Sequence, residues 1–257
     1  MKVVILCGGM GTRLAEETSV LPKPMVEIGG KPILWHIMNI YSHYGYNEFV
    51  IALGYKGDKI KEYFLNYRNL ESDLTIELKT GNTTITPKCN RDWIVHLVDT
   101  GLHTLTGGRI KRLAPILKDE SFMVTYGDGV ANVNINDLVA FHKGMGKIAT
   151  VTAVKPTARF GGIKFNNDLV TDFEEKPQSG EGMINGGFFV FEPEILNIIE
   201  DDKTILERTP INNLVINHQL AAFRHEGFWQ CMDTIREKQL LQSLWDNNEA
   251  QWKIWSD

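Results

Sequence analysis

The chain has 257 residues, of which 43% are hydrophobic and 23% charged, and its formal net charge is −5. This length and composition suit one domain with a large buried core. The acidic balance excludes an extended basic face for nucleic acid or anionic lipid, and no apolar run reaches the about 18 residues that span a bilayer, so we expect neither nucleic acid nor a membrane as a partner.

Short apolar runs and amphipathic stretches alternate through the first 155 residues. The runs typical of strands are residues 2–7, 48–53, 93–98, 121–126 and 148–154. The stretches typical of helices are residues 32–45, 59–67, 108–118 and 135–143. This alternation predicts a mostly parallel sheet with helices on both faces. The first run, KVVILC, is continuously apolar, as a strand covered on both faces should be.

Several helix ends carry residues with defined capping preferences. Pro32 suits the first position of a helix, and Gly45 suits its C-terminal end. Asp58 is suited to cap the following helix, because its carboxylate can accept hydrogen bonds from the free amides of the first turn.

Beyond about Arg159 the pattern changes to short β segments broken by glycines. These segments are residues 159–165, 169–177 and 183–193, and they predict a small antiparallel subdomain appended to the sheet. Helical patterns return at residues 193–200, 210–220 and 234–245. The chain shows no internal repeat and no linker rich in Pro, Ser or Gly, so we expect a single domain over residues 1–257.

A glycine loop follows the first strand, at the sheet edge where parallel α/β sheets bind ligands. Gly8, Gly9 and Gly11 allow backbone amides to converge on an anion. The loop is not a Walker motif, since Arg13 stands where its Gly-Lys should fall, and Leu14 replaces the third glycine of a dinucleotide fingerprint. A nicotinamide-dependent dehydrogenase is therefore disfavoured, whereas a simple tight turn remains an alternative.

Two cations accompany the glycine loop. Arg13 offers a fork of donors for phosphate oxygens, and Lys23 offers a movable point charge. Together they favour a nucleoside triphosphate as the ligand, although Lys23 could also be a solvated surface lysine. Asp128, in the turn YGDG after the strand 121–126, should lie at the same edge of the sheet.

Ordered motifs along the whole chain give a family resemblance. The stretch GGMGTRLAEETSVLPKPM resembles the N-terminal motif of the sugar-1-phosphate nucleotidyltransferases, and KPIL, YGDG, RFGGIKF, EEKP, NGGFFVF and GFWQCMDT follow in that family's order. Within the family, the chain is most similar to the glucose-1-phosphate cytidylyltransferases. The resemblance implies a three-layer α/β fold with a mostly parallel, Rossmann-like sheet and a small antiparallel sugar-binding subdomain.

The implied reaction is attack by α-D-glucose 1-phosphate on the α-phosphorus of CTP, which gives CDP-glucose and pyrophosphate for a bacterial surface polysaccharide such as O-antigen. The second pKa of a phosphate monoester is about 6, so the nucleophile is already an anion and needs no general base. Catalysis then depends on positioning and charge compensation. The same reaction with UTP or dTTP, and a non-catalytic nucleotide-sugar sensor, remain alternatives.

The resemblance also implies roles for individual residues on the nucleotide side, within residues 1–155. Arg13 would stabilise the departing pyrophosphate and Lys23 would reach the α-phosphate, which makes both catalytic. The other implied nucleotide-binding residues are Leu6, Cys7, Gly8, Gly9, Met10, Gly11 and Thr12. We further infer that Thr104 and the turn of Gly107, Gly108 and Arg109 contact the nucleotide. The helix that starts near Gly108 is expected to present its N-terminus to the ligand. The stretch DTGLHTLTGGRIKR, which contains this turn, departs from the glutamine and Gly-Leu turn usual in uridylyl and thymidylyl relatives.

By the same resemblance, Asp128 and Asp233 would hold Mg²⁺, the expected cofactor, and Asp128 would be catalytic. Carboxylate oxygens suit a magnesium ion that is shared with substrate phosphates. Two other interpretations stay open. Asp128 could be only a turn acid before glycine, and Asp233 could be the N-cap of the helix 234–245.

Residues 156–257 would mainly bind the sugar phosphate. The implied sugar-phosphate residues are Gly161, Glu175, Lys176, Asn185 and Gly186. From the residues alone, FEEKP is equally a charged strand end before a proline turn.

The remaining motifs carry no predicted chemistry. The cysteines at 7, 89 and 231 have no metal-binding spacing, and we interpret them as reduced thiols of a cytoplasmic protein. His36 and His43 share a helical face and are expected to pack or cap. The C-terminal QWKIWSD is expected to dock on the chain's own core or on a neighbouring subunit, and a homo-oligomer is expected.

Overall fold

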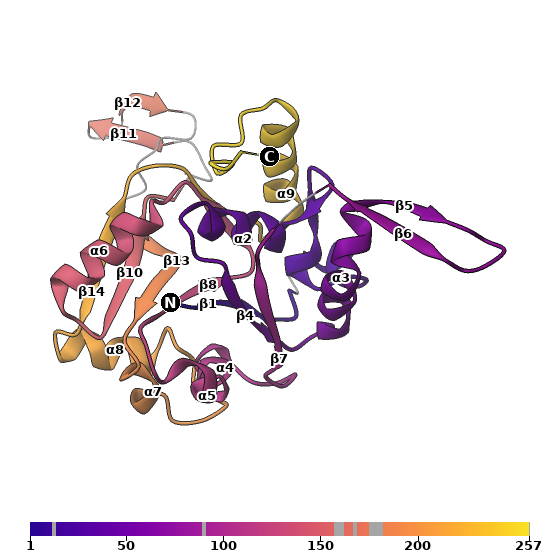
Figure 1. Cartoon of the computed structure of the whole chain (residues 1–257). Coiled ribbons are helices and arrows are strands. Elements are labelled where there is room, and N and C mark those ends of the chain that lie inside the picture. The colour runs from indigo at the N-terminus through magenta and orange to yellow at the C-terminus, as the bar shows by residue number, and fades with distance from the viewer. Residues whose placement is uncertain (12–13, 89–90, 157–161, 167–168, 175–181, 257) are drawn as a thin grey trace.

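The computed structural model describes residues 1–11, 14–88, 91–156, 162–166, 169–174 and 182–256. At its centre is a seven-stranded sheet with the order β14-β10-β13-β8-β1-β4-β7 (Figure 1). The strands are β1 (Val3–Cys7), β4 (Glu48–Leu53), β7 (Ile94–Asp99), β8 (Phe122–Tyr126), β10 (Ala149–Val154), β13 (Ile184–Phe191) and β14 (Leu220–His225). All of them run in one direction except β13, which is antiparallel to both of its neighbours. The predicted mostly parallel sheet is confirmed.

Side chains that alternate along β1 enter two separate cores. Val3 and Ile5 belong to one cluster, whereas Val4 and Leu6 belong to the other. The first cluster is closed by α2 (Ile33–His43), α3 (Gly57–Leu70), α6 (Ile135–Met145) and α9 (Ile235–Asp246). The second is closed by α4 (Thr106–Arg112), α5 (Ala114–Leu117), α7 (Ile195–Ile198) and α8 (Thr209–Ile216). The sheet is therefore covered on both faces, as the apolar run KVVILC predicted.

The helix boundaries confirm some of the predicted caps and correct others. Pro32 precedes α2, and Gly45 follows it with φ of +85°. Asp58 is not a cap, because α3 already begins at Gly57, after Lys56 in the left-handed region. The predicted helix 108–118 is two short helices, α4 and α5, since Pro115 occupies the first turn of α5 and cannot continue α4.

The second half departs furthest from the prediction. β11 (Gly162–Asn166) and β12 (Leu169–Glu174) form the expected antiparallel hairpin. The segment 183–193 is not part of that excursion, because β13 lies between β8 and β10 in the central sheet and its residues from Phe188 to Phe191 are buried. The predicted helices 193–200 and 210–220 shorten to α7 and α8, and the unpredicted strand β14 begins at Leu220.

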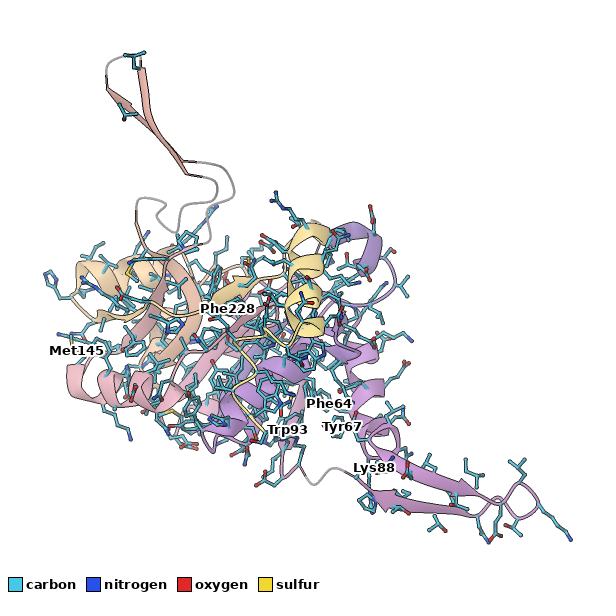
Figure 2. The ribbon with its side chains drawn as sticks, turned by 90° about the horizontal axis from the view of Figure 1, so that it is seen from above. Phe64, Tyr67, Lys88, Trp93, Met145 and Phe228 are labelled. Carbon is cyan, nitrogen blue, oxygen red and sulfur yellow. The ribbon has the colours of Figure 1, made fainter. Side chains whose placement is uncertain are left out.

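A second hairpin was not predicted at all. β5 (Ser72–Ile76) and β6 (Thr83–Pro87) pair with each other and extend far from the body beyond α3, as Figures 1 and 2 show, with Lys88 at the end where the chain returns. Leu74, Ile76 and Leu78 are exposed along it. None of the helices in the described part of the chain is long and apolar enough to cross a bilayer.

The C-terminal segment docks on the chain's own core, which was one of the two expected outcomes. Trp252 and Trp255 are buried, and the Trp252 Nε1 group donates to His36 Nδ1 at 3.3 Å. His36 is fully buried in α2, and its Nε2 lies 2.8 Å from the Ile28 carbonyl oxygen. Burial lowers the pKa of His36 to about 4. His36 is therefore a neutral packing residue, as predicted.

Candidate active site

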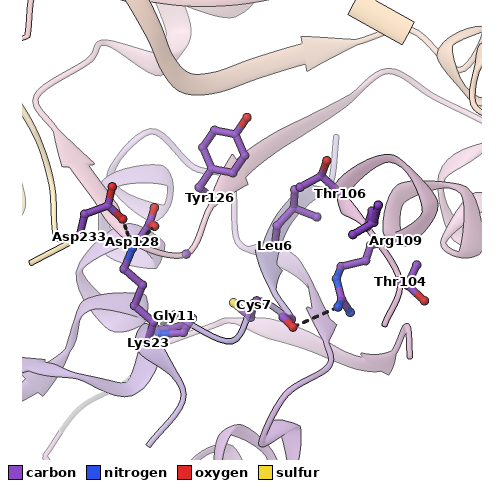
Figure 3. Close-up of a pocket in the computed structure, with 15 residues that line it drawn as sticks. Leu6, Cys7, Gly11, Lys23, Thr104, Thr106, Arg109, Tyr126, Asp128 and Asp233 are labelled. Atoms are coloured by element: carbon purple, nitrogen blue, oxygen red, sulfur yellow. Dashed lines mark hydrogen bonds and ion pairs between the residues drawn. The ribbon is translucent and has the colours of Figure 1, made fainter. Parts of the chain in front are cut away.

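A cavity of about 420 Å³ opens at the carboxyl ends of β1 and β8 (Figure 3). It is lined by Leu6, Cys7, Gly8, Gly9, Gly11, Lys23, Pro24, Thr104, Leu105, Thr106, Arg109, Tyr126, Gly127, Asp128 and Asp233. Most of the predicted nucleotide-side residues are therefore brought together. Met10 and Gly108 are not among the lining residues, and Met10 is 46% exposed. Sequence reasoning missed Thr106 and Tyr126, although Tyr126 ends a strand directly before the predicted GDG turn.

The structure does not describe five of the predicted site residues. Thr12, Arg13, Gly161, Glu175 and Lys176 lie outside the described residues.

Arg109 ties together the loops that follow three neighbouring strands. Its guanidinium donates to the Gly8 carbonyl after β1 at 3.0 Å and to the Leu53 carbonyl at the end of β4 at 2.9 Å. It also donates to Thr100 Oγ1 at 2.7 Å and to the Gly101 carbonyl at 2.8 Å, both after β7. The side chain is 4% exposed, and this burial lowers its pKa. Arg109 thus lines the cavity, but its donors are directed to the protein's own oxygens.

Gly8 is required for this arrangement. A Cβ added at Gly8 would lie 2.1 Å from the guanidinium carbon of Arg109. The buried Arg109 side chain therefore packs directly against the backbone of Gly8, and the glycine loop also lines the cavity.

Two acids that are far apart in sequence meet at one lysine. The short strands β9 (Gly129–Ala131) and β15 (Trp229–Cys231) pair antiparallel, and the Met232 amide donates to the Asp128 carbonyl at 2.8 Å. This pairing places the carboxylates of Asp128 and Asp233 on the same side. Lys23, at the start of the 3₁₀ turn η2 (Lys23–Met25), reaches Asp128 Oδ2 at 2.5 Å and also contacts Asp233 Oδ1 (Figure 3).

The charges of this trio are set by the contacts between its members. Burial alone would lower the pKa of Lys23, but Asp128 and Asp233 outweigh that effect and raise it above its ordinary value. Lys23 is consequently an ammonium ion at neutral pH, and it already occupies the point between the two carboxylates where a cation is favoured.

The donor chemistry at this point fits a magnesium ion. The side chains of Asp128 and Asp233 are 28% and 21% exposed, so their oxygens are accessible from the cavity. Two hard carboxylate ligands, with the remaining positions left to phosphate and water, are typical of Mg²⁺ shared with a nucleotide. The described residues contain no group of three or more His, Cys, Asp or Glu side chains that could hold a metal ion, so a metal here would also need ligands from the phosphates and water.

The alternative role considered for Asp233 is wrong. Thr234, not Asp233, is the N-cap of α9, and its hydroxyl accepts a hydrogen bond from the Glu237 amide at 3.3 Å. Glu237 Oε2 in turn accepts from the amides of Thr234 and Asp233. This capping box satisfies the helix end without the Asp233 side chain, which lines the cavity.

The expected free helix N-terminus near Gly108 is also not observed. The amide of Leu105 donates to the Asp202 carbonyl at 2.8 Å, and the amides of Gly107 and Gly108 donate to the Thr204 carbonyl at 3.0 and 3.3 Å. A Cβ at Gly108 would lie 2.5 Å from Asp202 Cα. The start of α4 is therefore closed by the segment 202–206 and does not offer these amides to a ligand.

A smaller cavity of about 220 Å³ adjoins the first. Three residues line both cavities, namely Tyr126, Asp128 and Asp233. Gly186, one of the predicted sugar-phosphate residues, lines the smaller cavity together with Trp229, whose Nε1 donates to the Gly186 carbonyl at 2.8 Å. Asn185 lies beside it, and its Nδ2 donates to the Tyr126 hydroxyl at 3.2 Å. The two acids thus stand at the junction of two cavities.

The cysteines near the site are not poised for chemistry. Cys7 is fully buried, and burial raises the pKa of its thiol far above the ordinary value. Burial likewise raises the pKa of Cys231 to about 12. Both remain protonated at neutral pH, in agreement with the absence of a predicted chemical role.

Comparison with known proteins finds relatives that match nearly the whole chain. A family described as "Nucleotidyl transferase" matches residues 2–251. The glucose-1-phosphate cytidylyltransferase of Salmonella typhimurium is 51% identical over 256 residues, which cover 99% of this chain and 100% of the relative. A Bacillus subtilis protein named "Probable glucose-1-phosphate cytidylyltransferase" is 44% identical with the same coverage. Among solved structures, HddC from Yersinia pseudotuberculosis superposes with a TM-score of 0.65 at 22% identity, covering 95% of this chain and 99% of that one.

Proposed function

The chain belongs to the nucleotidyl transferase family, and on that premise we propose that it transfers the cytidylyl group of CTP to α-D-glucose 1-phosphate, with CDP-glucose and pyrophosphate as products. The observation that carries this proposal is the convergence of Lys23, Asp128 and Asp233 where two cavities meet. The likeness to glucose-1-phosphate cytidylyltransferases over the whole chain supports the choice of substrates.

In the proposed reaction, a phosphate oxygen of the sugar phosphate forms a bond to the α-phosphorus of CTP while the bond to the bridging oxygen of pyrophosphate breaks. The attacking oxygen is an anion near neutral pH, so the side chains are needed for positioning and charge compensation. We assign Lys23 to the α-phosphate and Arg13 to the departing pyrophosphate. Asp128 and Asp233 would hold Mg²⁺, which when bound neutralises charge on the phosphate oxygens.

The two cavities suggest how the substrates are divided. We assign the nucleotide to the larger cavity, with Gly8, Gly9 and Gly11 around its phosphates and Thr104 on the opposite wall. We assign the sugar phosphate to the smaller cavity, where Gly186 lies. Asn185, Gly161, Glu175 and Lys176 complete this half of the proposal. Because the cavities share Asp128 and Asp233, the two substrates would meet at the proposed metal site.

The experiment that tests the function is pyrophosphate release in the presence of Mg²⁺ and glucose 1-phosphate, measured with CTP, UTP, dTTP and ATP in parallel. The proposal expects CTP to give the highest kcat/KM. A higher value with UTP or dTTP would refute the choice of base. Tight binding of CDP-glucose without release from any triphosphate would refute catalysis and favour a nucleotide-sugar sensor. Asp128→Asn is the matched control, since it keeps the side-chain shape and removes one anionic oxygen.

We also propose that the protein is a cytoplasmic homo-oligomer that supplies a nucleotide sugar for surface polysaccharide. The free thiols of Cys7 and Cys231 support a reducing compartment. The β5–β6 hairpin supports self-association, because an isolated two-stranded ribbon is marginally stable in water and this one exposes Leu74, Ile76 and Leu78. Light scattering coupled to size-exclusion chromatography measures the assembly, and a monomer at micromolar concentration would contradict this part of the proposal.

A further inference from the structure

A single carboxylate behind the nucleotide cavity binds two side chains that form its wall. Glu207 precedes α8, and its Oε2 accepts a hydrogen bond from Thr106 Oγ1 at 2.7 Å. Its Oε1 accepts from the Tyr126 hydroxyl at 2.5 Å. Thr106 is the first residue of α4 and Tyr126 is the last residue of β8, and both line the larger cavity, whereas Glu207 does not. One acid therefore joins the two sides of the cavity from outside it.

The hydrogen bonds around Glu207 leave little freedom to either hydroxyl. Thr106 Oγ1 accepts from the Leu206 amide at 3.0 Å, so its own hydrogen is directed to Glu207. The Tyr126 hydroxyl accepts from Asn185 Nδ2, so its hydrogen is likewise directed to Glu207. Burial and the nearby Glu207 charge raise the pKa of Tyr126, which keeps the phenol protonated. The hydroxyls of Thr106 and Tyr126 thus each accept one hydrogen bond and donate one, and both donate to Glu207.

The ring of Tyr126 is also held from behind. Gly187 has φ of +79°, and a Cβ there would lie 2.5 Å from the Tyr126 ring. On another side, the Phe189 ring packs edge-on against it, with the ring centroids 6.1 Å apart. Tyr126 lines both cavities and stands two residues before Asp128. The orientation of this ring consequently affects the boundary between the proposed nucleotide and sugar-phosphate sites.

We infer that Glu207 is a positioning residue for the transfer: through Tyr126 and Thr106 it fixes the junction of the two cavities, and thereby the alignment of the attacking phosphate with the α-phosphorus. The inference rests on the proposed function for its substrates. It requires no contact between Glu207 and either substrate. Its effect is therefore expected on turnover and on ligands that occupy both cavities, rather than on ligands that occupy one.

The test compares Glu207→Gln with wild type. The glutamine keeps the size of the side chain, but only its oxygen can accept, so at most one of the two hydroxyls keeps its acceptor. We expect kcat to fall about tenfold or more, with the KM for CTP changed less than about twofold, as for loss of an interaction that matters in the transition state. Glu194→Gln, at an exposed position before α7, is the control and should leave both parameters unchanged. Unfolding midpoints of both variants separate this effect from loss of the fold.

A double variant tests the route through Tyr126. If Glu207 acts partly by holding the phenol, Glu207→Gln should cost less in the Tyr126→Phe background than it costs alone, because the contact with Thr106 is then the only one of the two left to break. A Glu207→Gln protein that folds and turns over like wild type would overturn the inference, and so would two losses that multiply independently.

A binding arm distinguishes failure of this inference from failure of the proposed function. Calorimetric titrations on wild type and Glu207→Gln use CDP-glucose, which the proposed function places across both cavities, and CMP, which it places in the larger one. We expect affinity for CDP-glucose to fall at least fivefold while affinity for CMP changes less than twofold. Wild type that binds CDP-glucose but releases no pyrophosphate refutes the catalytic function and leaves Glu207 to be judged by these titrations. Equal losses for CDP-glucose and CMP would make Glu207 a general structural residue.

Discussion

Replacing Arg109 with methionine removes the guanidinium that joins the loops after β1, β4 and β7. Methionine is apolar and unbranched, so it can follow the aliphatic part of the arginine side chain, but it ends before the guanidinium and donates no hydrogen bond. After the change, the Gly8 carbonyl keeps one weaker bond from the Tyr55 amide at 3.3 Å, and the Leu53 carbonyl keeps its bonds from Thr100. The Gly101 carbonyl has no other hydrogen-bond donor among the described residues.

These remaining bonds allow the loss of stability to be estimated. A hydrogen bond from a charged donor contributes roughly 1.5–3 kcal/mol net, and an orphaned buried acceptor costs about 1–3 kcal/mol. The variant removes this donor from five acceptors, of which the Gly8 and Leu53 carbonyls keep other donors, but it no longer buries a guanidinium. We therefore expect the free energy of unfolding to fall by about 3 kcal/mol. The free energy of unfolding of Arg109→Lys should lie between those of Arg109→Met and wild type, because one ammonium group cannot make all the hydrogen bonds by which the guanidinium reaches three loops.

Urea denaturation followed by circular dichroism measures this loss, and calorimetry measures CTP affinity on the same samples. Arg112→Met is the control. Arg112 lies on the same helix, is exposed, and pairs with Asp202 at 2.6 Å, so its replacement should move the midpoint little. An unchanged midpoint for Arg109→Met, together with a large loss of CTP affinity, would refute this reasoning. Arg109 would then be a direct nucleotide ligand, as the sequence first suggested.

Four further outcomes are expected. Lys23→Ala should lower kcat about 100-fold, since one transition-state donor is worth about 3 kcal/mol, and it should also lower the unfolding midpoint, because it removes the cation that lies between Asp128 and Asp233; near-normal turnover would contradict its role. Asp128→Asn and Asp233→Asn should each be partly rescued by excess Mg²⁺ and should combine less than additively, whereas additive losses without rescue would place the metal elsewhere. Gly8→Ala should destabilise the protein measurably in urea, because its Cβ would collide with a buried guanidinium. Burial lowers the pKa of His36 to about 4, so the unfolded state binds the proton first as the pH falls, and the free energy of unfolding should fall by at most about 3 kcal/mol between about pH 6.5 and 4. His36→Asn should flatten the pH profile of the urea midpoint, and an unchanged slope would show that another group titrates.

The central strands of the first half could be predicted because their signals are local, whereas the hairpin of β5 and β6 in the same half was missed. KVVILC is continuously apolar, and the strand it predicts is buried on both faces. The segment of β13 was assigned to the wrong sheet for an equally local reason, because Gly186 and Gly187 resemble the breaks of a small excursion. In the structure, Gly187 serves close approach, since a side chain there would meet the Tyr126 ring. A glycine required by a distant neighbour cannot be told from a turn glycine in the sequence.

The candidate site was predictable to a different extent for each residue. The family motifs indicated Asp128 and Asp233, but their meeting depends on the pairing of two three-residue strands, which spacing does not encode. Arg109 was expected at the nucleotide because of its place in the stretch DTGLHTLTGGRIKR, and its partners are carbonyl oxygens on three loops. Glu207 had no motif to mark it. Its position follows only from the contact between the segments around residues 106 and 207.

The closure of α4 by the segment 202–206 has a consequence for enzyme engineering. The turn at Thr104–Arg109 is built on a support that lies about a hundred positions later, through the carbonyls of Asp202 and Thr204 and the ion pair of Arg112 with Asp202. Residues 104–112 and 202–206 therefore form one structural unit, although they are far apart in the sequence. A chimera that takes only residues 100–112 from a relative with another nucleotide preference would place that loop against residues 202–206 of this chain, which do not match it. Exchanging residues 200–208 in the same chimera keeps the two stretches together and leaves Asp128 and Asp233 unchanged.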